Sequence, residues 1–273
     1  MTTQDRANGL RALLLAVAAS ATFGATPSHA REYCPDRPGI NTPPCTMEPS
    51  KLSAEASFGD WTHDSSSDEV DDTVIVGDLA LRYGLGESTE LRLGWTAYGH
   101  MRSKDRISGD ISRQSGTGDV TLGIKQNLLD PEGKSFSVAL LPSVTLPTGG
   151  HAIGSGDWSA SLSIPVNVPI SDSIAFIAAP EIDAATDEDR KGRHLAYGSA
   201  AGLAISLGEA INLAIEAQVL RDDDPQGHTT ETIGGIAAGF SLSENAQFDC
   251  ASEFALNANA PDVRVYVGFA RRF

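Results

Sequence analysis

The sequence predicts an all-β protein, a single up-and-down antiparallel barrel that spans a membrane with about twelve strands. Three observations predict this fold. The chain breaks into segments of about ten residues in which apolar and polar side chains alternate, which is typical of strands. Short and long connections alternate between these segments. No stretch after residue 30 holds the eighteen or so consecutive apolar residues that a membrane-spanning helix needs.

The composition excludes several classes of protein. The 273 residues include 36 Asp+Glu against 20 Lys+Arg, which gives a formal net charge of −16. A surface this acidic repels phosphate backbones, so we expect no nucleic-acid partner. The content of 41% hydrophobic and 21% charged residues fits neither a disordered chain nor a helical membrane protein.

Residues 1–30 are predicted to be a secretory signal peptide. A basic start that includes Arg11 precedes the apolar run 13–23, and small residues follow before Ala30. We expect cleavage between Ala30 and Arg31, so the chain is predicted to be exported.

Residues 31–50 are predicted to form a proline-rich arm. Cys34 and Cys45 flank a segment too rich in proline for a helix or a central strand. Export favours a Cys34–Cys45 disulfide, which would contribute roughly 2–3 kcal/mol, whereas two free thiols in a disordered arm are the alternative. The arm lies either in the periplasm or in the barrel lumen. Cys250 is left over and is expected to act as a small apolar residue.

Residues 51–273 are predicted to form the barrel. In residues 90–99, for example, Leu91, Leu93 and Trp95 share one face, whereas Arg92, Thr96 and Tyr98 share the other. The alternation predicts twelve strands, at 52–61, 73–85, 90–101, 116–128, 135–146, 157–169, 174–183, 194–207, 211–220, 230–242, 247–255 and 262–273.

The connections are predicted to differ between the two ends of the barrel. In a meander every short connection falls at one end, and outer-membrane barrels have short periplasmic turns and longer external loops. The short connections are 86–89, 129–134, 170–173, 208–210 and 243–246. The longer ones are 62–72, 102–115, 147–156, 184–193 and 221–229, together with 256–261.

The apolar face of each strand is predicted to meet lipid and the polar face to line a lumen. Aromatic residues at the strand ends would form two interfacial girdles, with Trp61, Tyr98 and Trp158 at the long-loop end and Tyr83, Phe136, Phe248 and Phe273 at the other. The lumen-facing candidates are Asp78, Arg82, Arg92, Asp119, Lys125, Glu181, Asp183, Glu216, Glu231, Asp249, Glu253, Arg264 and Arg272. These charges either make the pore mildly cation-selective or pair across the lumen and fill it.

The C-terminal strand resembles the signal that the bacterial barrel-assembly machinery reads. It alternates apolar residues through Phe269 and ends in Phe273, although Arg271 departs from the usual pattern. We therefore expect the assembly machinery, outer-membrane lipid and lipopolysaccharide to be partners of the chain.

Three blocks resemble the outer-membrane proteins of the MetA pathway of phenol degradation family. They are Gly116-Thr117-Gly118-Asp119-Val120-Thr121-Leu122-Gly123-Ile124-Lys125, Leu141-Pro142-Ser143-Val144-Thr145-Leu146-Pro147-Thr148-Gly149, and Gly154-Ser155-Gly156-Asp157-Trp158. The resemblance covers residues 51–273 and leaves out the arm. It implies a barrel of the transporter type for small, often aromatic or apolar, compounds, and it assigns no site residue.

No catalytic residue, metal ligand or cofactor is predicted. His63, His100, His151, His194 and His228 each fall in, or at the root of, a different long connection. Together they could bind a transition metal at the external mouth, but no two have the spacing of paired ligands, so we expect them to be solvated loop histidines.

We therefore predict an outer-membrane channel or transporter for passive or gated passage of a small-molecule solute. A structural or adhesive barrel is the alternative. A lipid hydrolase is a further one, but it requires a nucleophile and a base within hydrogen-bond reach, and the sequence has no Gly-x-Ser-x-Gly motif.

Overall fold

The computed structural model describes residues 31–150 and 152–273. The predicted signal peptide lies outside the described residues. Within them, no helix combines the length and the apolar character that crossing a membrane requires.

Fourteen strands form the described part of the chain. They are β1 (Leu52–Ser65), β2 (Glu69–Gly86), β3 (Thr89–Asp105), β4 (Ile111–Gly116), β5 (Val120–Leu129), β6 (Ser137–Leu146), β7 (Ser159–Ser163), β8 (Val166–Pro169), β9 (Ile174–Thr186), β10 (Arg193–Leu207), β11 (Ile211–Asp224), β12 (Gly227–Ser243), β13 (Ala246–Ala255) and β14 (Val263–Arg272).

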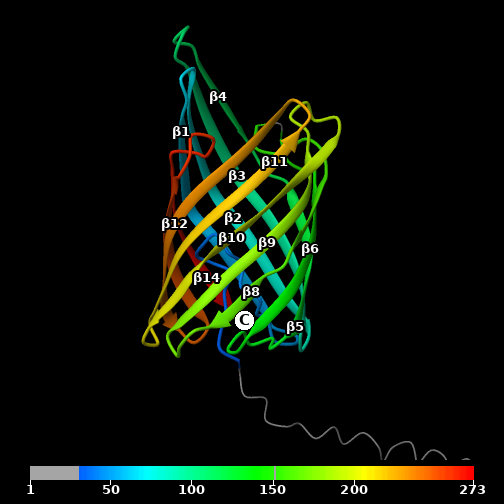
Figure 1. Ribbon diagram of the computed structural model, residues 1–273, viewed down its shortest axis with the longest axis vertical. Coiled ribbons are helices and arrows are strands. Elements are labelled where there is room, and N and C mark those ends of the chain that lie inside the picture. The colour runs from blue at the N-terminus through cyan, green and yellow to red at the C-terminus, as the bar shows by residue number, and fades with distance from the viewer. Residues whose placement is uncertain (1–30, 151) are drawn as a thin grey trace, which may run out of the picture. The chain divides into compact units, whose positions relative to one another are not determined.

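The strands form one closed antiparallel barrel (Figure 1). Neighbours in sequence pair with each other, and the last strand, β14, pairs with β1 to close the sheet. β4 and β5 pair one after the other with β3, and β7 and β8 both lie between β6 and β9, so the fourteen strands occupy twelve positions around the barrel. The predicted fold class is confirmed.

One predicted strand, 157–169, is interrupted. β7 ends at Ser163 and β8 begins at Val166, with the fully buried Pro165 between them. Proline has no N–H to donate to a neighbouring strand, so the ladder breaks there even though the apolar alternation continues.

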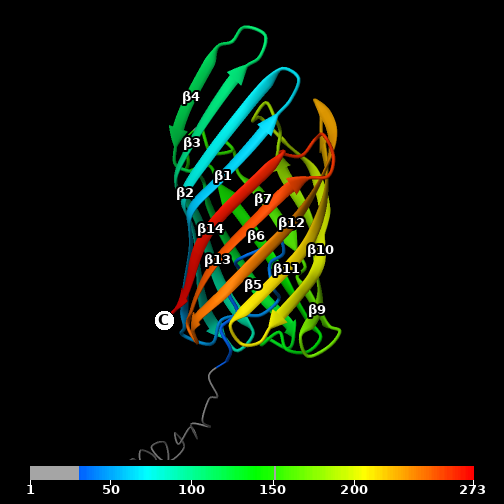
Figure 2. The ribbon, with the colours of Figure 1, turned by 90° about the vertical axis from the view of Figure 1, so that its left-hand side faces the viewer.

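The difference between the two ends is confirmed, but three predicted loops are mostly strand. β1 and β2 stay paired as far as Ser65 and Val70, β3 and β4 as far as Lys104 and Ile111, and β11 and β12 as far as Asp224 and Gly227. Beyond the lipid both faces of a hairpin meet water, so the side chains lose the alternation while the backbones still pair. Figure 2 shows the β1–β2 and β3–β4 hairpins rising beyond the rest of the barrel.

The outer face of the barrel is apolar. The aromatic residues expected in the girdles, Trp61, Tyr98, Trp158, Tyr83, Phe136, Phe248 and Phe273, are all between 36% and 58% exposed. Tyr98 was predicted on the polar face and instead lies outside with its register partner Val76. Along β2, the outward-facing side chains lie at even-numbered positions before Gly77 and at odd-numbered positions after it. The φ of 70° at Gly77 interrupts the extended backbone there.

The apolar outer face generates a stability prediction. Ile236 lies in the middle of β12, is 55% exposed, and has Ile215 and Ser252 as cross-strand neighbours. We expect Ile236→Arg to lower the free energy of unfolding in lipid vesicles by about 2–4 kcal/mol, because arginine would face hydrocarbon. Urea titration followed by tryptophan fluorescence measures the change. Ser243→Arg, at the end of the same strand, is the control, and an equal loss in both variants would contradict a lipid-facing Ile236.

Candidate functional site

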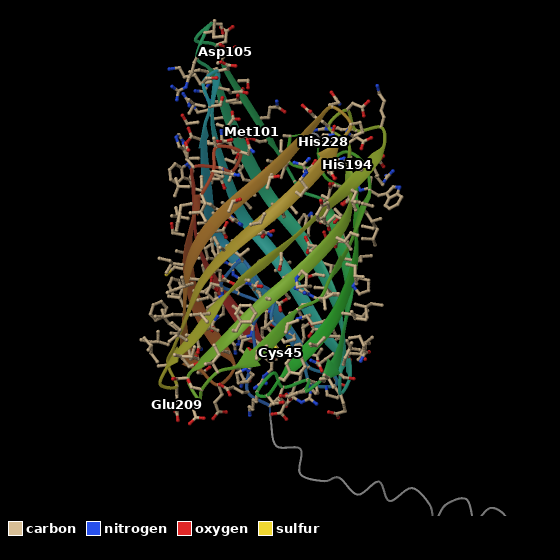
Figure 3. The ribbon with its side chains drawn as sticks, viewed as in Figure 1. Cys45, Met101, Asp105, His194, Glu209 and His228 are labelled. Atoms are coloured by element: carbon tan, nitrogen blue, oxygen red, sulfur yellow. A yellow bond between two sulfur atoms is a disulfide. The ribbon has the colours of Figure 1, made fainter. Side chains whose placement is uncertain are left out.

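The arm lies inside the barrel at the end with the short turns. Its residues contact inward side chains of β1, β2, β3, β5, β11, β13 and β14. Figures 1 and 2 show the blue segment within the lower part of the barrel, and Figure 3 labels Cys45 there. The sequence left open whether the arm lies in the periplasm or in the barrel lumen, and in the structure it lies in the lumen.

Wall carboxylates accept hydrogen bonds from the backbone of the arm. The arm has no regular secondary structure, so its buried N–H groups need partners elsewhere. Glu216 accepts the backbone N–H of Ile40 at 2.8 Å and that of Asn41 at 2.9 Å. Glu55 accepts the N–H of Asp36 at 3.0 Å. These bonds hold two separate points of the arm to β11 and β1.

Wall cations and amides donate to the carbonyl groups of the arm. The guanidinium of Arg82 donates to the carbonyl of Cys34 at 2.7 Å, and Lys125 Nζ donates to that of Pro43 at 2.9 Å. The Gln247 amide donates to the Arg37 carbonyl at 2.7 Å. The wall therefore satisfies both the donors and the acceptors of the arm.

Asp36 is the centre of a buried charge network. Arg82 Nη1 lies 3.2 Å and Lys125 Nζ 3.0 Å from Asp36 Oδ1, and Arg92 Nη2 contacts Oδ2. The side chains of Arg82 and Lys125 are fully buried. Buried cations of this kind are tolerated only with close anions, because removing one partner leaves an uncompensated charge.

Two wall carboxylates complete this network. Glu90 Oε2 lies 3.0 Å from Arg82 Nη2, and Glu55 Oε1 lies 3.3 Å from Arg82 Nη1. Glu90 also accepts the backbone N–H of Met47 at 2.8 Å. The network thus balances three cations, Arg82, Arg92 and Lys125, with three carboxylates, one of which belongs to the arm.

A second ion pair fixes the arm to the neighbouring part of the wall. Arg37 Nη2 lies 3.0 Å from Asp249 Oδ1 in β13, and Arg37 Nη1 donates to Ser57 Oγ at 2.8 Å. The Arg37 guanidinium also lies 5.0 Å from the centre of the Tyr266 ring. Adjacent arm residues, Asp36 and Arg37, therefore bind oppositely charged groups on one continuous stretch of the wall, from β13 to β5.

A disulfide joins Cys34 and Cys45, whose Cα atoms are 6.5 Å apart. The carbonyl of Cys34 accepts from Arg82 at 2.7 Å, and the carbonyl of Cys45 accepts from Lys125 at 3.2 Å. The disulfide brings both ends of the proline-rich segment to the same two cations. Cys250 of β13 is the free cysteine of the described chain, half-buried and in register with Val267.

The remaining lumen candidates form smaller groups. Arg264 pairs with Asp60 at 2.6 Å and Glu253 at 3.3 Å. Arg272 lies 3.5 Å from Glu48 of the arm. The other candidates lie nearer the long-loop end: Asp78 accepts from Thr96 at 2.9 Å, Glu181 and Asp183 are in register with Ser163 and Ser161, and Glu231 is in register with Leu220.

The described residues of the connection after β6, 147–150 and 152–158, fold against β3 and the β4–β5 junction. Asp119 accepts hydrogen bonds from the backbone N–H of Gly149 and of Ser155, both at 2.7 Å, and from the Ser155 hydroxyl at 2.7 Å. Ile153 packs at Gly99, where a Cβ would lie 2.5 Å from Ile153 Cδ1. Gly99 alternates with the exposed Tyr98, so this connection lies on the inner face of the wall.

A cavity of about 790 Å³ remains beside the arm. Arm residues, including Pro38 and Pro43, line one side of it. The other side is lined by β8, β9, β10 and β11, with Ile177, Ala204 and Ala214 at inward positions of the wall. The arm therefore fills the lumen unevenly, with contacts concentrated on the β1–β5 and β11–β14 walls and open space next to β8–β11.

Sequence reasoning missed several residues that hold the arm, among them Glu55, Glu90, Asn127 and Gln247. Asn127 donates to the carbonyl of Pro44 at 2.9 Å. The available signal was alternation, because Glu55 lies between Ala54 and Ala56 on the polar face of the strand predicted at 52–61. That signal gives the direction of a side chain and not its partner.

Solved outer-membrane barrels share this fold. The COG4313 outer membrane channel from Pseudomonas putida F1 matches with a TM-score of 0.69 at 17% identity, covering 87% of this chain and 99% of that one. The translocator domain of the autotransporter NalP from Neisseria meningitidis matches with a TM-score of 0.51 at 13% identity, covering 82% and 88%. The NanC porin matches with a TM-score of 0.50 at 9% identity, covering 81% and 98%.

At the sequence level, no curated protein matches the chain. A family match does exist, and it extends over residues 35–273, which include most of the arm and the whole barrel. The chain belongs to the family described as "Putative MetA-pathway of phenol degradation".

Proposed function

We propose that the protein is an outer-membrane channel for small molecules and that its N-terminal arm restricts the passage. The observation that carries the proposal is the cavity of about 790 Å³ between the arm and the β8–β11 wall. A barrel with a packed interior would serve a structural role, whereas open space beside a separately anchored segment suits transport. The fold shared with the Pseudomonas putida outer membrane channel supports the proposal.

The proposed solute is a small compound with an apolar body, such as an aromatic acid. The inward positions of the wall beside the cavity are held by apolar side chains such as Ile177, Ala204 and Ala214, and prolines of the arm also line it. Membership of a family described by phenol degradation supports the same substrate class. The polar groups needed to orient a substituent are present in Asn212 and Ser206.

The location follows from the same reasoning. The apolar outer face suits the hydrocarbon of the outer membrane, with lipid and lipopolysaccharide around it. At the short-turn end the backbone N–H of Phe273 bonds to the carbonyl of Leu52 at 2.7 Å, and its ring is 58% exposed. The proposal therefore has Phe269 and Phe273 read by the assembly machinery before closure and places the short turns in the periplasm.

The substrate class is tested by swelling of liposomes that contain the purified protein. We expect faster swelling with small aromatic acids than with sugars or amino acids of similar size, because the cavity wall is aliphatic. No swelling with any solute would favour the structural or adhesive alternative. Release of fatty acids from the same vesicles with added Ca²⁺ would favour the lipid hydrolase.

The role of the arm is tested by Asp36→Asn. The substitution removes the arm's negative charge from Arg82, Arg92 and Lys125, so the arm should detach and the single-channel conductance in planar bilayers should rise several-fold. The matched control is Glu209→Gln in the exposed β10–β11 turn at the same end (Figure 3), which should leave conductance unchanged. Unchanged conductance in a folded Asp36→Asn protein would contradict a restricting arm.

The inward connection after β6 generates a pH prediction. Burial alone would raise the pKa of Asp119, but hydrogen bonds from Ser155 and Gly149 hold the pKa below its ordinary value. A lowered pKa stabilises the folded state above about pH 4, and this contribution is lost as the pH falls further through the lowered pKa. Conductance should therefore rise below about pH 4 as the connection detaches.

Asp119→Asn separates this effect from general acid unfolding. The amide offers one acceptor oxygen in place of two, so the variant should show the higher conductance already at pH 7. Asp110→Asn, in the exposed β3–β4 connection, is the control. An acid-induced increase of the same size in wild type and Asp119→Asn would show that another group is responsible.

A further inference from the structure

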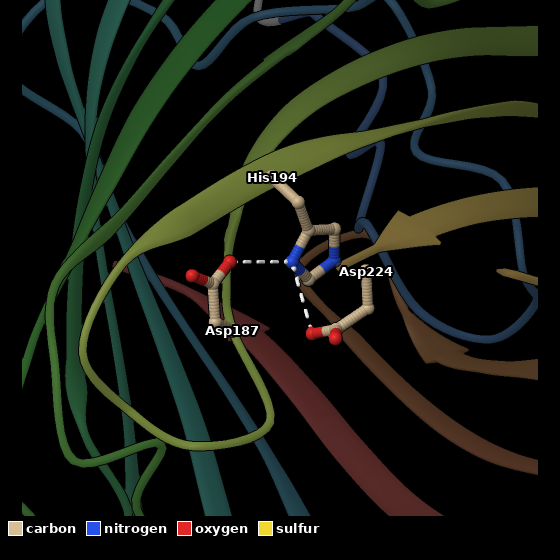
Figure 4. Close-up of side chains that lie close together, drawn as sticks. All are labelled: Asp187, His194 and Asp224. Atoms are coloured by element: carbon tan, nitrogen blue, oxygen red, sulfur yellow. Dashed lines mark hydrogen bonds and ion pairs between the residues drawn. The ribbon is translucent and has the colours of Figure 1, made fainter. Parts of the chain in front are cut away.

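A histidine and three aspartates converge at the long-loop end of the barrel. Asp187 follows β9, His194 begins β10, and Asp222 and Asp224 end β11. In Figure 4 the His194 ring points between Asp187 and Asp224, and Figure 3 places His194 near the upper rim. The ligand atoms of Asp187, His194 and Asp224 all lie within 4.8 Å of one another.

The distances fit ligands around one metal ion. His194 Nδ1 lies 3.0 Å from Asp187 Oδ1 and 3.3 Å from Asp224 Oδ2. Ligands that are each about 2.1 Å from a tetrahedral zinc ion lie about 3.4 Å from one another. The separation from Asp224 already has this value and that from Asp187 is shorter, so small rotations of the two carboxylates would fit all three ligands around one ion.

The hydrogen-bonding capacity of His194 points in the same direction. Its side chain is only 5% exposed, and a single ring nitrogen, Nδ1, faces two carboxylate oxygens. Nδ1 carries either one N–H or one lone pair, so it cannot serve both carboxylates with one hydrogen. A cation placed between the three groups would contact both oxygens and the lone pair.

Asp222 supplies the supporting contact that metal-bound histidines usually have. Its Oδ1 lies 2.9 Å from Nε2 of His194, on the side of the ring away from Asp187 and Asp224. This is an ion-pair distance, and Nε2 makes no hydrogen bond with any residue that the structure describes. A small rotation of the Asp222 carboxylate would let it accept a hydrogen from Nε2, which leaves Nδ1 free to bind a metal. Asp222 is therefore a positioning residue rather than a ligand.

Backbone groups orient the Asp224 carboxylate. Oδ2 accepts the N–H of Glu188 at 2.8 Å, and Oδ1 accepts the N–H of Gln226 at 2.7 Å. The cationic side chains nearby have other partners, since Arg193 pairs with Asp157 at 2.6 Å and Arg221 with Asp223 at 2.8 Å. The carboxylates of Asp187, Asp222 and Asp224 thus share His194 as their recorded cationic partner. The group therefore carries an excess of negative charge.

We propose that Asp187, His194 and Asp224 bind a divalent transition-metal ion such as zinc and thereby tie the β9–β10 connection to the end of β11. One imidazole nitrogen and two carboxylate oxygens favour such an ion over calcium, which prefers oxygen ligands alone. The site is independent of the arm and of the proposed passage.

The test is calorimetric titration of Zn²⁺ into the full-length exported protein in detergent, after removal of metals with a chelator. We expect saturable binding of one ion, abolished by His194→Ala. Asp187→Asn and Asp224→Asn should each weaken it, and Asp222→Asn should weaken it ~10–100-fold without abolishing it. No saturable binding by the wild type would overturn the proposal.

Two matched controls come from other histidine–aspartate pairs of the same chain. His63 Nδ1 lies 2.9 Å from Asp72 Oδ1, and His228 Nδ1 lies 3.4 Å from Asp223 Oδ1. Neither belongs to a set of three converging ligands among the described residues. His63→Ala and His228→Ala should bind Zn²⁺ as the wild type does, and loss of binding in either variant together with normal binding in His194→Ala would overturn the assignment.

A second measurement covers the possibility that a variant misfolds. The β9–β10 connection, 187–192, contains Arg190 and the exposed Lys191, both of which are trypsin sites. Zn²⁺ should slow cleavage there in the wild type and have no effect in His194→Ala, while heat-modifiable gel migration confirms that both barrels are folded. Equal cleavage of the wild type with and without Zn²⁺ would contradict a metal that joins the two segments.

Discussion

Charge balance inside the barrel is the constraint on which the arrangement of the lumen depends. Arg82 and Lys125 are fully buried, and Arg92 lies beside them, so the wall alone offers three cations to two carboxylates, Glu55 and Glu90. Asp36 of the arm supplies the missing negative charge. Partners for buried charges are worth several kcal/mol because the alternative is an unsolvated ion. The wall and the arm are therefore parts of one electrostatic unit.

The lipid-facing half of the structure is what the sequence could predict. Hydrocarbon requires an apolar side chain at every second position, so alternation reveals the strands, as it does for Leu91, Leu93 and Trp95. The signal disappears where this requirement ends. The hairpins beyond Val70 and Ile111 are paired but polar on both faces, Pro165 breaks the ladder without breaking the pattern, and Gly77 turns Tyr98 outward.

The interior was predictable only in part, because alternation assigns a face and says nothing of partners. Arg82 and Lys125 could be assigned to the polar face, but their pairing with Asp36 depends on the path of an arm that has no periodic pattern. The group around His194 has the same origin. Asp187 and Asp224 are 37 residues apart in the sequence, and the register in which β10 pairs with β9 and β11 brings both of them to His194.

The covalent ring of the arm has a consequence for the cell envelope. Cys34 and Cys45 close residues 34–45 into a loop, and the carbonyl oxygens at both of its ends accept hydrogen bonds from buried cations of the wall. If the two thiols were reduced, the same carbonyls would belong to an open chain. Such a chain would lose more conformational entropy when the arm binds to the wall. The proposed restriction of the passage by the arm is thereby linked to the supply of oxidising equivalents in the compartment where the protein matures.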